Sequence, residues 1–392
     1  MEKPHQDLKE KLSIGIILLG GVSLLTDISS ETVFAVLPDF LTTLGAGAVI
    51  IGLVGGIEDA LVGVLNLFSG HYSGKKKEKR PIVFSGYFLS ACSKLGLVFS
   101  TVWPLALLFR STDRAGKGIR KSPRDAIIAS LTERRGYGFG VHRAMDTTGA
   151  IIGPLLAFLF IGLGYPKLFL LAAGIGFVAL IPLFWVREKE TKLNPRKLSL
   201  SLKALPRESL VTIGLITFFD IGNFTYMFLM LRAYEFCSVQ IAILLYLLSK
   251  VSEAALSIPF GVLSDRVGKH YILSFGYFVF ALTCIGFAFN RVFWTLPILF
   301  LLYGVFKASV DPVQRAYISD MVPEDLRPTA LGTIHMALDL ATLPASLIAG
   351  LLMAKFTSST PFLYGASIGV MASVLLVYYG TRIAKRKSLS SN

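Results

Sequence analysis

Residues 13–38 read SIGIILLGGVSLLTDISSETVFAVLP, an apolar run of membrane-spanning length with Asp27 in its middle. A second run, residues 209–233, reads SLVTIGLITFFDIGNFTYMFLMLRA and carries Asp220 in the same place. An α-helix needs roughly 20 apolar residues to cross a bilayer. A charged side chain at that depth is costly unless it is paired or faces water. The two runs therefore predict membrane helices, each with a carboxylate that is a candidate functional group.

The chain repeats itself at the offset that separates these two aspartates. A histidine with an aspartate four residues later occurs in both halves, and so does an embedded cation. The other ionisable pairs at this spacing are Arg114 with Lys307, His142 with His335, and Asp146 with Asp339. A parallel repeat of this kind predicts two related halves, as in many transporters.

The composition excludes a soluble fold. The chain is 53% hydrophobic and 16% charged, whereas a soluble domain carries roughly 25% charged residues. We predict an all-α integral membrane protein with twelve transmembrane helices in two pseudo-symmetric six-helix halves. The predicted segments are 13–38, 47–70, 81–101, 104–124, 140–163, 167–187, 209–233, 239–262, 271–289, 293–316, 327–354 and 361–382.

The net charge of +14 comes from basic residues that are distributed as in a membrane protein rather than as in a nucleic-acid-binding protein. Basic residues gather in the even-numbered connections, for example at 75–80 and 187–197, and in the C-terminal tail. The odd-numbered connections hold only the isolated Lys167, Arg291 and Lys355. By the positive-inside rule, both termini lie in the cytoplasm of a protein of the plasma (inner) membrane. Anionic lipid headgroups, not nucleic acid, are then the expected partners of the basic residues.

A polar, proline-containing stretch at residues 188–208 divides the chain. It predicts a cytoplasmic linker between an N-terminal half, residues 1–187, and a C-terminal half, residues 209–392. The three cysteines are scattered and form no metal-ligand spacing, so we expect neither a metal site nor a cofactor.

The connection after the eighth segment reads GVLSDRVGK over residues 261–269. This resembles the G-x-L-x-D-R-x-G-[RK] signature of the major facilitator superfamily. Glycine permits a tight turn, and aspartate is favoured at a neighbouring helix N-terminus by the helix dipole. The first-half loop has Tyr72 where the aspartate belongs. The family uses this loop to latch the outward-facing state, so we expect a latch at Asp265 and none at Tyr72.

Two further motifs carry the resemblance over essentially the whole chain. Arg114-Ala-Gly-Lys117-Gly118 is similar to the family's R-x-x-Q-G, with lysine in place of glutamine. In proton-coupled members this arginine is associated with proton transfer. Residues 149–154, GAIIGP, are similar to the G-x-x-x-G-P of drug:proton antiporters. The resemblance therefore implies an antiporter-like transporter.

The resemblance places the first, fourth, seventh and tenth helices around a central cavity. A carboxylate there exchanges a proton or contacts the substrate; the alternative is a permanent salt bridge between helices. Glu58, Asp59 and Lys94 lie in the second and third helices, which we expect at the interface between the halves, where they form interhelical pairs or gate contacts. The predicted proton-coupling and substrate residues are Asp27, Glu31, Asp113, Arg114, Asp220, Asn223, Lys307 and Asp311.

The repeated histidine–aspartate pairs lie close to the cytoplasmic ends of the fifth and eleventh helices. Gate or capping contacts are favoured for them over a proton relay or a metal site, because two ligands in each half do not close a site. The predicted gating residues are Gly261, Asp265, Arg266, Gly268, His142, Asp146, His335 and Asp339.

We therefore expect a monomeric secondary transporter that exchanges protons for a small organic or amphipathic solute and expels that solute by alternating access. One alternative is proton-coupled uptake of a small charged solute. A second, from a different class, is a lipid scramblase or flippase. An enzyme is not expected, because no nucleophile–base set stands out, and the sequence holds no P-loop for ATP.

Overall fold

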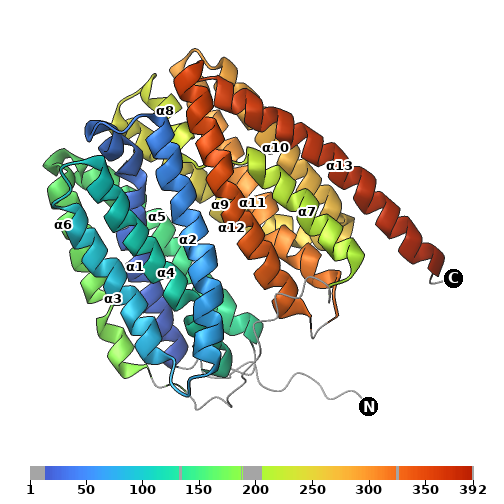
Figure 1. Cartoon of the computed structure of the whole chain (residues 1–392), viewed down its shortest axis with the longest axis horizontal. Helices are drawn as coiled ribbons and strands as arrows, with labels where there is room; N and C mark the ends of the chain where they lie inside the picture. The colour runs from blue at the N-terminus through green and yellow to red at the C-terminus, as the bar shows by residue number, and fades with distance from the viewer. Residues whose placement is uncertain (1–13, 132–134, 187, 189–204, 324–325, 391–392) are drawn as a thin grey trace.

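The structure is a computed structural model that describes residues 14–131, 135–186, 188, 205–323 and 326–390. These residues form a bundle of long α-helices (Figure 1). The helices of the N-terminal half are α1 (Ile14–Thr43), α2 (Ala48–Gly74), α3 (Arg80–Leu97), α4 (Trp103–Leu131), α5 (Arg135–Phe160) and α6 (Tyr165–Val178). Those of the C-terminal half are α7 (Arg207–Gly222), α8 (Met227–Tyr234), α9 (Val239–Val267), α10 (Lys269–Phe289), α11 (Leu296–Asp320), α12 (Arg327–Lys355) and α13 (Thr360–Ser390).

Ten spans in the described part of the chain are long and apolar enough to cross a membrane. One of them joins α6 to the short 3-10 helix η2 (Ile181–Trp185), and another joins α7 to α8. α3 and α4 fall outside this group, because polar and basic residues interrupt their sequences. Each predicted segment contains helix, so the all-α membrane fold is confirmed, while membrane crossing by α3 and α4 stays a prediction.

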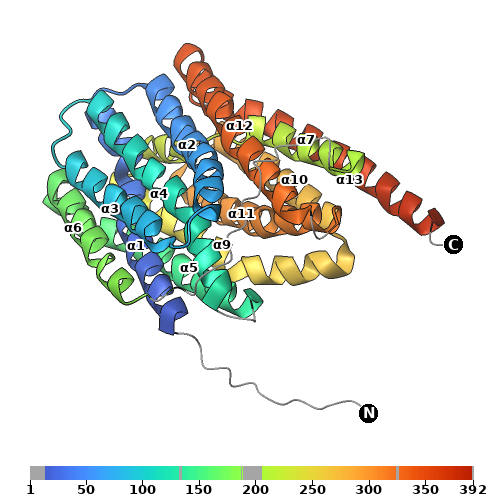
Figure 2. The same ribbon diagram turned by 60° about the horizontal axis from the view of Figure 1, so that its bottom comes forward.

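The packing of the helices repeats between the halves. α1 packs against α5, α2 and α3 pack against α4, and α3 packs against α6. In the same way α7 packs against α12, α9 and α10 pack against α11, and α10 packs against α13. Figures 1 and 2 both show α1 to α6 gathered on one side, with α10, α11 and α13 on the other. The predicted boundaries stay untested, because most of the linker, 188–208, lies outside the described residues.

The predicted seventh segment is not one continuous helix. α7 ends at Gly222 and α8 begins at Met227, because the backbone of Asn223 leaves the helical conformation, with φ −92° and ψ 78°. The backbone N–H of Thr225 donates instead to Oγ of Ser346 on α12, at 3.0 Å. A break at membrane depth is tolerated where neighbouring helices satisfy the freed backbone groups in this way.

The two halves meet mainly where α2 packs against α12. A methyl group added at Gly52 of α2 would lie 2.2 Å from the carbonyl oxygen of Ser346 on α12, so the helices touch backbone to backbone there. The expectation that the third helix also lies at this interface is wrong. α3 packs against α4 and α6, and its Lys94 points to Asp113 of α4, with Nζ 3.7 Å from Oδ1.

Candidate functional site

Asp27 and Glu31 lie one turn apart on α1, and both side chains are partly exposed although they sit inside the bundle. The phenol of Tyr246 on α9 donates a hydrogen bond to Oε2 of Glu31 at 3.0 Å, so Glu31 contacts the other half. Asp27 makes no ion pair within 4.0 Å in the described residues. Of the charged groups around it, Lys117 of α4 has the largest electrostatic effect.

Arg114 belongs to a buried network of charges between α2, α3 and α4. Glu58 accepts hydrogen bonds from Arg110 Nε at 2.9 Å, from Arg110 Nη2 at 3.0 Å, and from Arg114 Nε at 3.0 Å. Asp113 accepts from Arg110 Nη1 at 2.9 Å and lies 3.7 Å from Lys94 Nζ. Arg114 is thus held by Glu58 rather than by a carboxylate of α1. The expectation of interhelical pairs for Glu58 and Lys94 is confirmed, and predicted Asp113 is buried with them.

Asp59 directly follows Glu58 but lies on a different side of α2, since neighbouring helix positions are about 100° apart. Its side chain is exposed in the middle of the helix. Arg114 of the N-terminal half and Lys307 of the C-terminal half both act on it electrostatically. Asp59 therefore faces the space between the halves. The sequence analysis assigned Asp59 to contacts at the interface between the halves. Its position directly after Glu58 already indicates that the two carboxylates face different sides of α2.

The C-terminal half provides its own charged residues at the same depth. Asp220 is buried near the end of α7, where Nδ2 of Asn223 donates to its Oδ1 at 2.8 Å. Lys307 and Asp311 lie one turn apart on α11 and are partly exposed. Asp311 has the largest electrostatic effect among the charged neighbours of Lys307. Asp220 and Lys307 are not in direct contact, as no ion pair within 4.0 Å joins them in the described residues.

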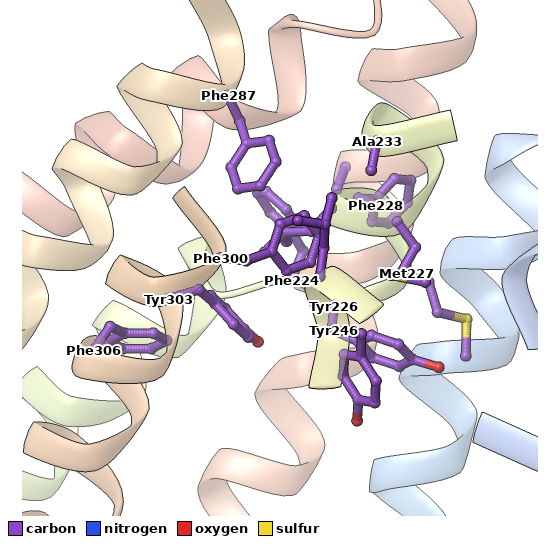
Figure 3. Close-up of a cluster of buried hydrophobic side chains, with 14 of the residues drawn as sticks. Phe224, Tyr226, Met227, Phe228, Ala233, Tyr246, Phe287, Phe300, Tyr303 and Phe306 are labelled. Carbon is purple, nitrogen blue, oxygen red and sulfur yellow. The ribbon is translucent and has the colours of Figure 1, made fainter. Parts of the chain in front are cut away.

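Aromatic side chains from both halves meet beside these charges. The rings of Phe34 (α1) and Tyr226 lie 4.1 Å apart, and those of Tyr226 and Tyr246 lie 5.0 Å apart. The phenol of Tyr226 donates to the backbone carbonyl of Phe34. The guanidinium of Arg114 lies 4.8 Å from the centre of the Phe34 ring. Figure 3 shows Tyr226 and Tyr246 side by side at the edge of the larger apolar core.

The two histidine–aspartate pairs differ, although the repeat predicts equal geometry. Nδ1 of His142 lies 3.4 Å from Oδ2 of Asp146. No corresponding bond joins His335 to Asp339 within the described ranges, because Asp339 packs against α2. A methyl group at Gly63 of α2 would lie 2.6 Å from the Cβ of Asp339. No group of three histidine, cysteine, aspartate or glutamate side chains that could hold a metal ion occurs among the residues searched.

The superfamily signature lies mostly inside α9 rather than in a loop, contrary to the prediction. Residues 261–267 are helical, and the connection to α10 is the single residue Gly268, with φ +114°. Asp265 and Asp320 each approach Nζ of Lys269 at 2.7 Å. The contact shown by Asp265 is therefore with a lysine and not with a helix N-terminus.

Two further residues of the signature are open to their surroundings. Arg266 is exposed, and Gly261 has open space where a Cβ would lie. Tyr72 is exposed as well, with Nζ of Lys76 5.1 Å from the centre of its ring. A phenol in contact with a lysine does not replace the missing carboxylate.

Comparisons with known proteins agree on the family. The sequence profile of the Major Facilitator Superfamily matches residues 19–235 and 210–392. An uncharacterised MFS-type transporter of Methanocaldococcus jannaschii is 40% identical over 390 residues, which cover 96% of this chain and 98% of the relative. The multi-drug resistance efflux pump PmrA of Streptococcus pneumoniae is 30% identical over 131 residues, 33% of each chain.

Solved structures share the fold at low sequence identity. The nucleoside transporter NupG is 14% identical with a TM-score of 0.78, over 93% of this chain and 99% of that chain. The POT family transporter PepTSo is 12% identical with a TM-score of 0.80, over 95% and 98%. The membrane helices, the internal repeat and these matches all point the same way: the chain belongs to the Major Facilitator Superfamily of membrane transporters.

Proposed function

We propose that the protein is a proton-coupled antiporter that expels a small amphipathic organic solute by alternating access. The observation that carries the proposal is Asp27. Its carboxylate lies inside a membrane helix, is partly exposed, and has no direct cationic partner in the described part of the chain. A carboxylate in such a place is suited to bind and release a proton, as in other transporters. Arg114 is suited to be a fixed positive charge in the same half, because Glu58 holds it in place.

The class of solute is inferred from the groups between the halves. Phe34, Tyr226 and Tyr246 offer ring faces from both halves. Asp59 and Lys307 offer charges of both signs nearby. Such a lining suits a solute with an apolar body and a charged or polar group. Efflux is supported by the G-x-x-x-G-P motif and by the partial similarity to a multidrug efflux pump.

The halves are proposed to rock about this centre as a monomer in the plasma membrane, with both termini in the cytoplasm. The basic connections support that orientation, because positively charged loops stay on the cytoplasmic side. Glu31 and Phe34 follow Asp27 on α1. The contacts of Tyr246 with Glu31 and of Tyr226 with Phe34 therefore lie on the side of Asp27 away from the basic end of the bundle. Protons, the solute and membrane lipids are the partners that this mechanism needs.

The test uses purified protein in liposomes. Ethidium is the amphipathic probe, and an anionic dye is measured in parallel as a second probe of opposite charge. Antiport predicts that ethidium accumulates in vesicles with an acidic lumen, because protons leaving the vesicle drive it inward. Asp27→Asn should remove this accumulation, whereas exposed Thr148→Val should keep it. Accumulation in vesicles with an alkaline lumen instead would indicate symport. Probe flux that ignores the pH gradient in the wild type would refute proton coupling.

A further inference from the structure

Two buried polar atoms on the face of α5 that packs against α1 have no hydrogen-bond partner among the described residues. They are Nε2 of His142 and Oδ1 of Asp146. Buried polar atoms are almost always hydrogen-bonded, to protein or to ordered water. His142, Asp146 and Gly149 share one face of α5, because they follow one another at intervals of four and three residues, and Gly149 lies against Asp27. The contact between α1 and α5 therefore contains polar groups that call for a partner such as water.

Glycines of α5 press this helix directly against the acidic face of α1. A methyl group at Gly149 would lie 3.0 Å from the Cβ of Asp27, and one at Gly153 would lie 2.6 Å from the Cβ of Glu31. Asp146 precedes Gly149 by three residues and so shares its face of α5. At 1.5 Å of rise per residue, Asp146 lies roughly 4.5 Å from Gly149 along the helix axis, towards the basic end. Asp146 is therefore about one turn from Asp27.

The charges around Asp27 favour movement of a proton towards α5 and oppose movement towards α4. The charged groups that act on Asp27 from other helices are Lys117, Arg120 and Arg124 of α4 and Asp146 of α5. A proton leaving Asp27 is repelled by the three cations and attracted by the carboxylate. Arg124 also contacts α1 directly, through Nη1 and Oγ of Ser23 at 3.1 Å.

Asp146 is placed to exchange protons with solution. Its side chain is 15% exposed, while its Oδ1 atom is buried and turned away from solvent. Its other oxygen lies 3.4 Å from His142. The residue therefore connects the contact between α1 and α5 with the basic end of the bundle.

We propose that Asp146, with His142, forms a proton path between Asp27 and the basic end of the N-terminal half. One proton leaves the carboxyl group of Asp27 and crosses, through bridging water, to the carboxylate of Asp146. From there it passes to solution, and no other bond changes. The path rests on the proposed proton coupling at Asp27, and the second half lacks it because His335 and Asp339 are not paired.

The test measures proton exchange at Asp27 without any transported solute. Infrared difference spectra identify the carboxyl band of Asp27 as the band that Asp27→Asn removes. After transfer to D2O, this band shifts as the proton is replaced. We expect Asp146→Asn to slow the shift by about 100-fold or more, the scale on which positioned acid–base groups act. Thr148→Val, on the exposed side of α5, should leave the rate unchanged.

Two further outcomes separate this path from the proposed function and from a structural effect. Asp146→Glu retains the carboxylate and should restore most of the rate, whereas a purely structural role would make both substitutions alike. A wild-type exchange rate in correctly folded Asp146→Asn would overturn the path while leaving proton coupling intact. If the wild type shows no Asp27 carboxyl band at any pH, the proposed function itself fails.

Discussion

Replacing Glu58 by glutamine should destabilise the fold more than any other single loss of a carboxylate in the N-terminal half. Glu58 is 2% exposed and accepts three hydrogen bonds from two guanidinium groups. Glutamine offers one acceptor oxygen instead of two, and its amide N–H groups would point at the N–H donors of the guanidinium groups. Breaking a buried ion pair by removing one partner costs about 3–5 kcal/mol, because a charge stays buried without its counter-ion. We expect Glu58→Gln to lose free energy of unfolding in that range.

Glu31→Gln is the matched control for this loss. It makes the same substitution at a similar depth, but its partner is the neutral phenol of Tyr246 at 3.0 Å. Exchanging a charged hydrogen bond for a neutral one costs about 1 kcal/mol. Equilibrium unfolding in mixed micelles, followed by circular dichroism, would compare the two variants.

A double-mutant cycle makes the reasoning specific to the network. Once Arg114→Gln has removed one cation, Glu58→Gln should cost less than it does in the wild type, because one fewer charge is left unpaired. Equal costs for Glu58→Gln and Glu31→Gln would refute the idea that the buried network holds α2 and α4 together. A cost of Glu58→Gln that does not change in the Arg114→Gln background would contradict their direct coupling.

The remaining predictions concern transport and gating. Asp27→Asn should abolish uphill transport under a pH gradient, yet leave the protein folded and membrane-inserted, as liposome flux and size-exclusion profiles would show. Arg114→Lys should slow flux and Arg114→Ala should slow it further, because lysine lacks the planar group that contacts both a carboxylate and a ring. Gly149→Ala should cost about 1–3 kcal/mol of stability by overpacking against α1, whereas Gly140→Ala, which meets no atom within 4 Å, should be at least as stable as the wild type, because alanine favours a helix over glycine by roughly 1 kcal/mol. Asp265→Asn breaks a largely exposed ion pair worth about 0.2–1 kcal/mol, so distances between probes on the two halves should shift only slightly; a full change of state would contradict the exposed geometry.

Much of this fold could be predicted because the bilayer restricts what a chain can do. Apolar runs of fixed length must be helices, since every backbone group in lipid needs an internal partner. The two halves could be predicted for a different reason, because ionisable residues such as Asp27 and Asp220 recur at one constant offset. The break between α7 and α8 could not be read in this way, because it depends on Ser346, which is distant in sequence and close only in the folded bundle.

The sequence does not determine which of the embedded charged residues form ion pairs with one another. Arg114 had four carboxylates within reach of a plausible helix arrangement, at Asp27, Glu31, Glu58 and Asp59. Which one it contacts depends on the rotation of α2 and α4 about their axes, and a rotation of one residue, about 100°, exchanges Glu58 for Asp59. The same rotation decides which carboxylate is fixed and which stays accessible. The sequence therefore names candidate charged groups, while their pairing appears only in the folded bundle.

The division between fixed and accessible charges fits the proposal that the halves move against each other. Within the N-terminal half, Glu58 ties Arg110 and Arg114 together through buried ion pairs, whose loss costs about 3–5 kcal/mol. Across the interface, the bonds from Tyr226 to Phe34 and from Tyr246 to Glu31 are single hydrogen bonds. Each contributes only about 0.5–3 kcal/mol and can be exchanged for water. We propose that a rocking motion breaks these contacts together with the packing of α2 against α12, and that Glu31 meets water when α1 separates from α9.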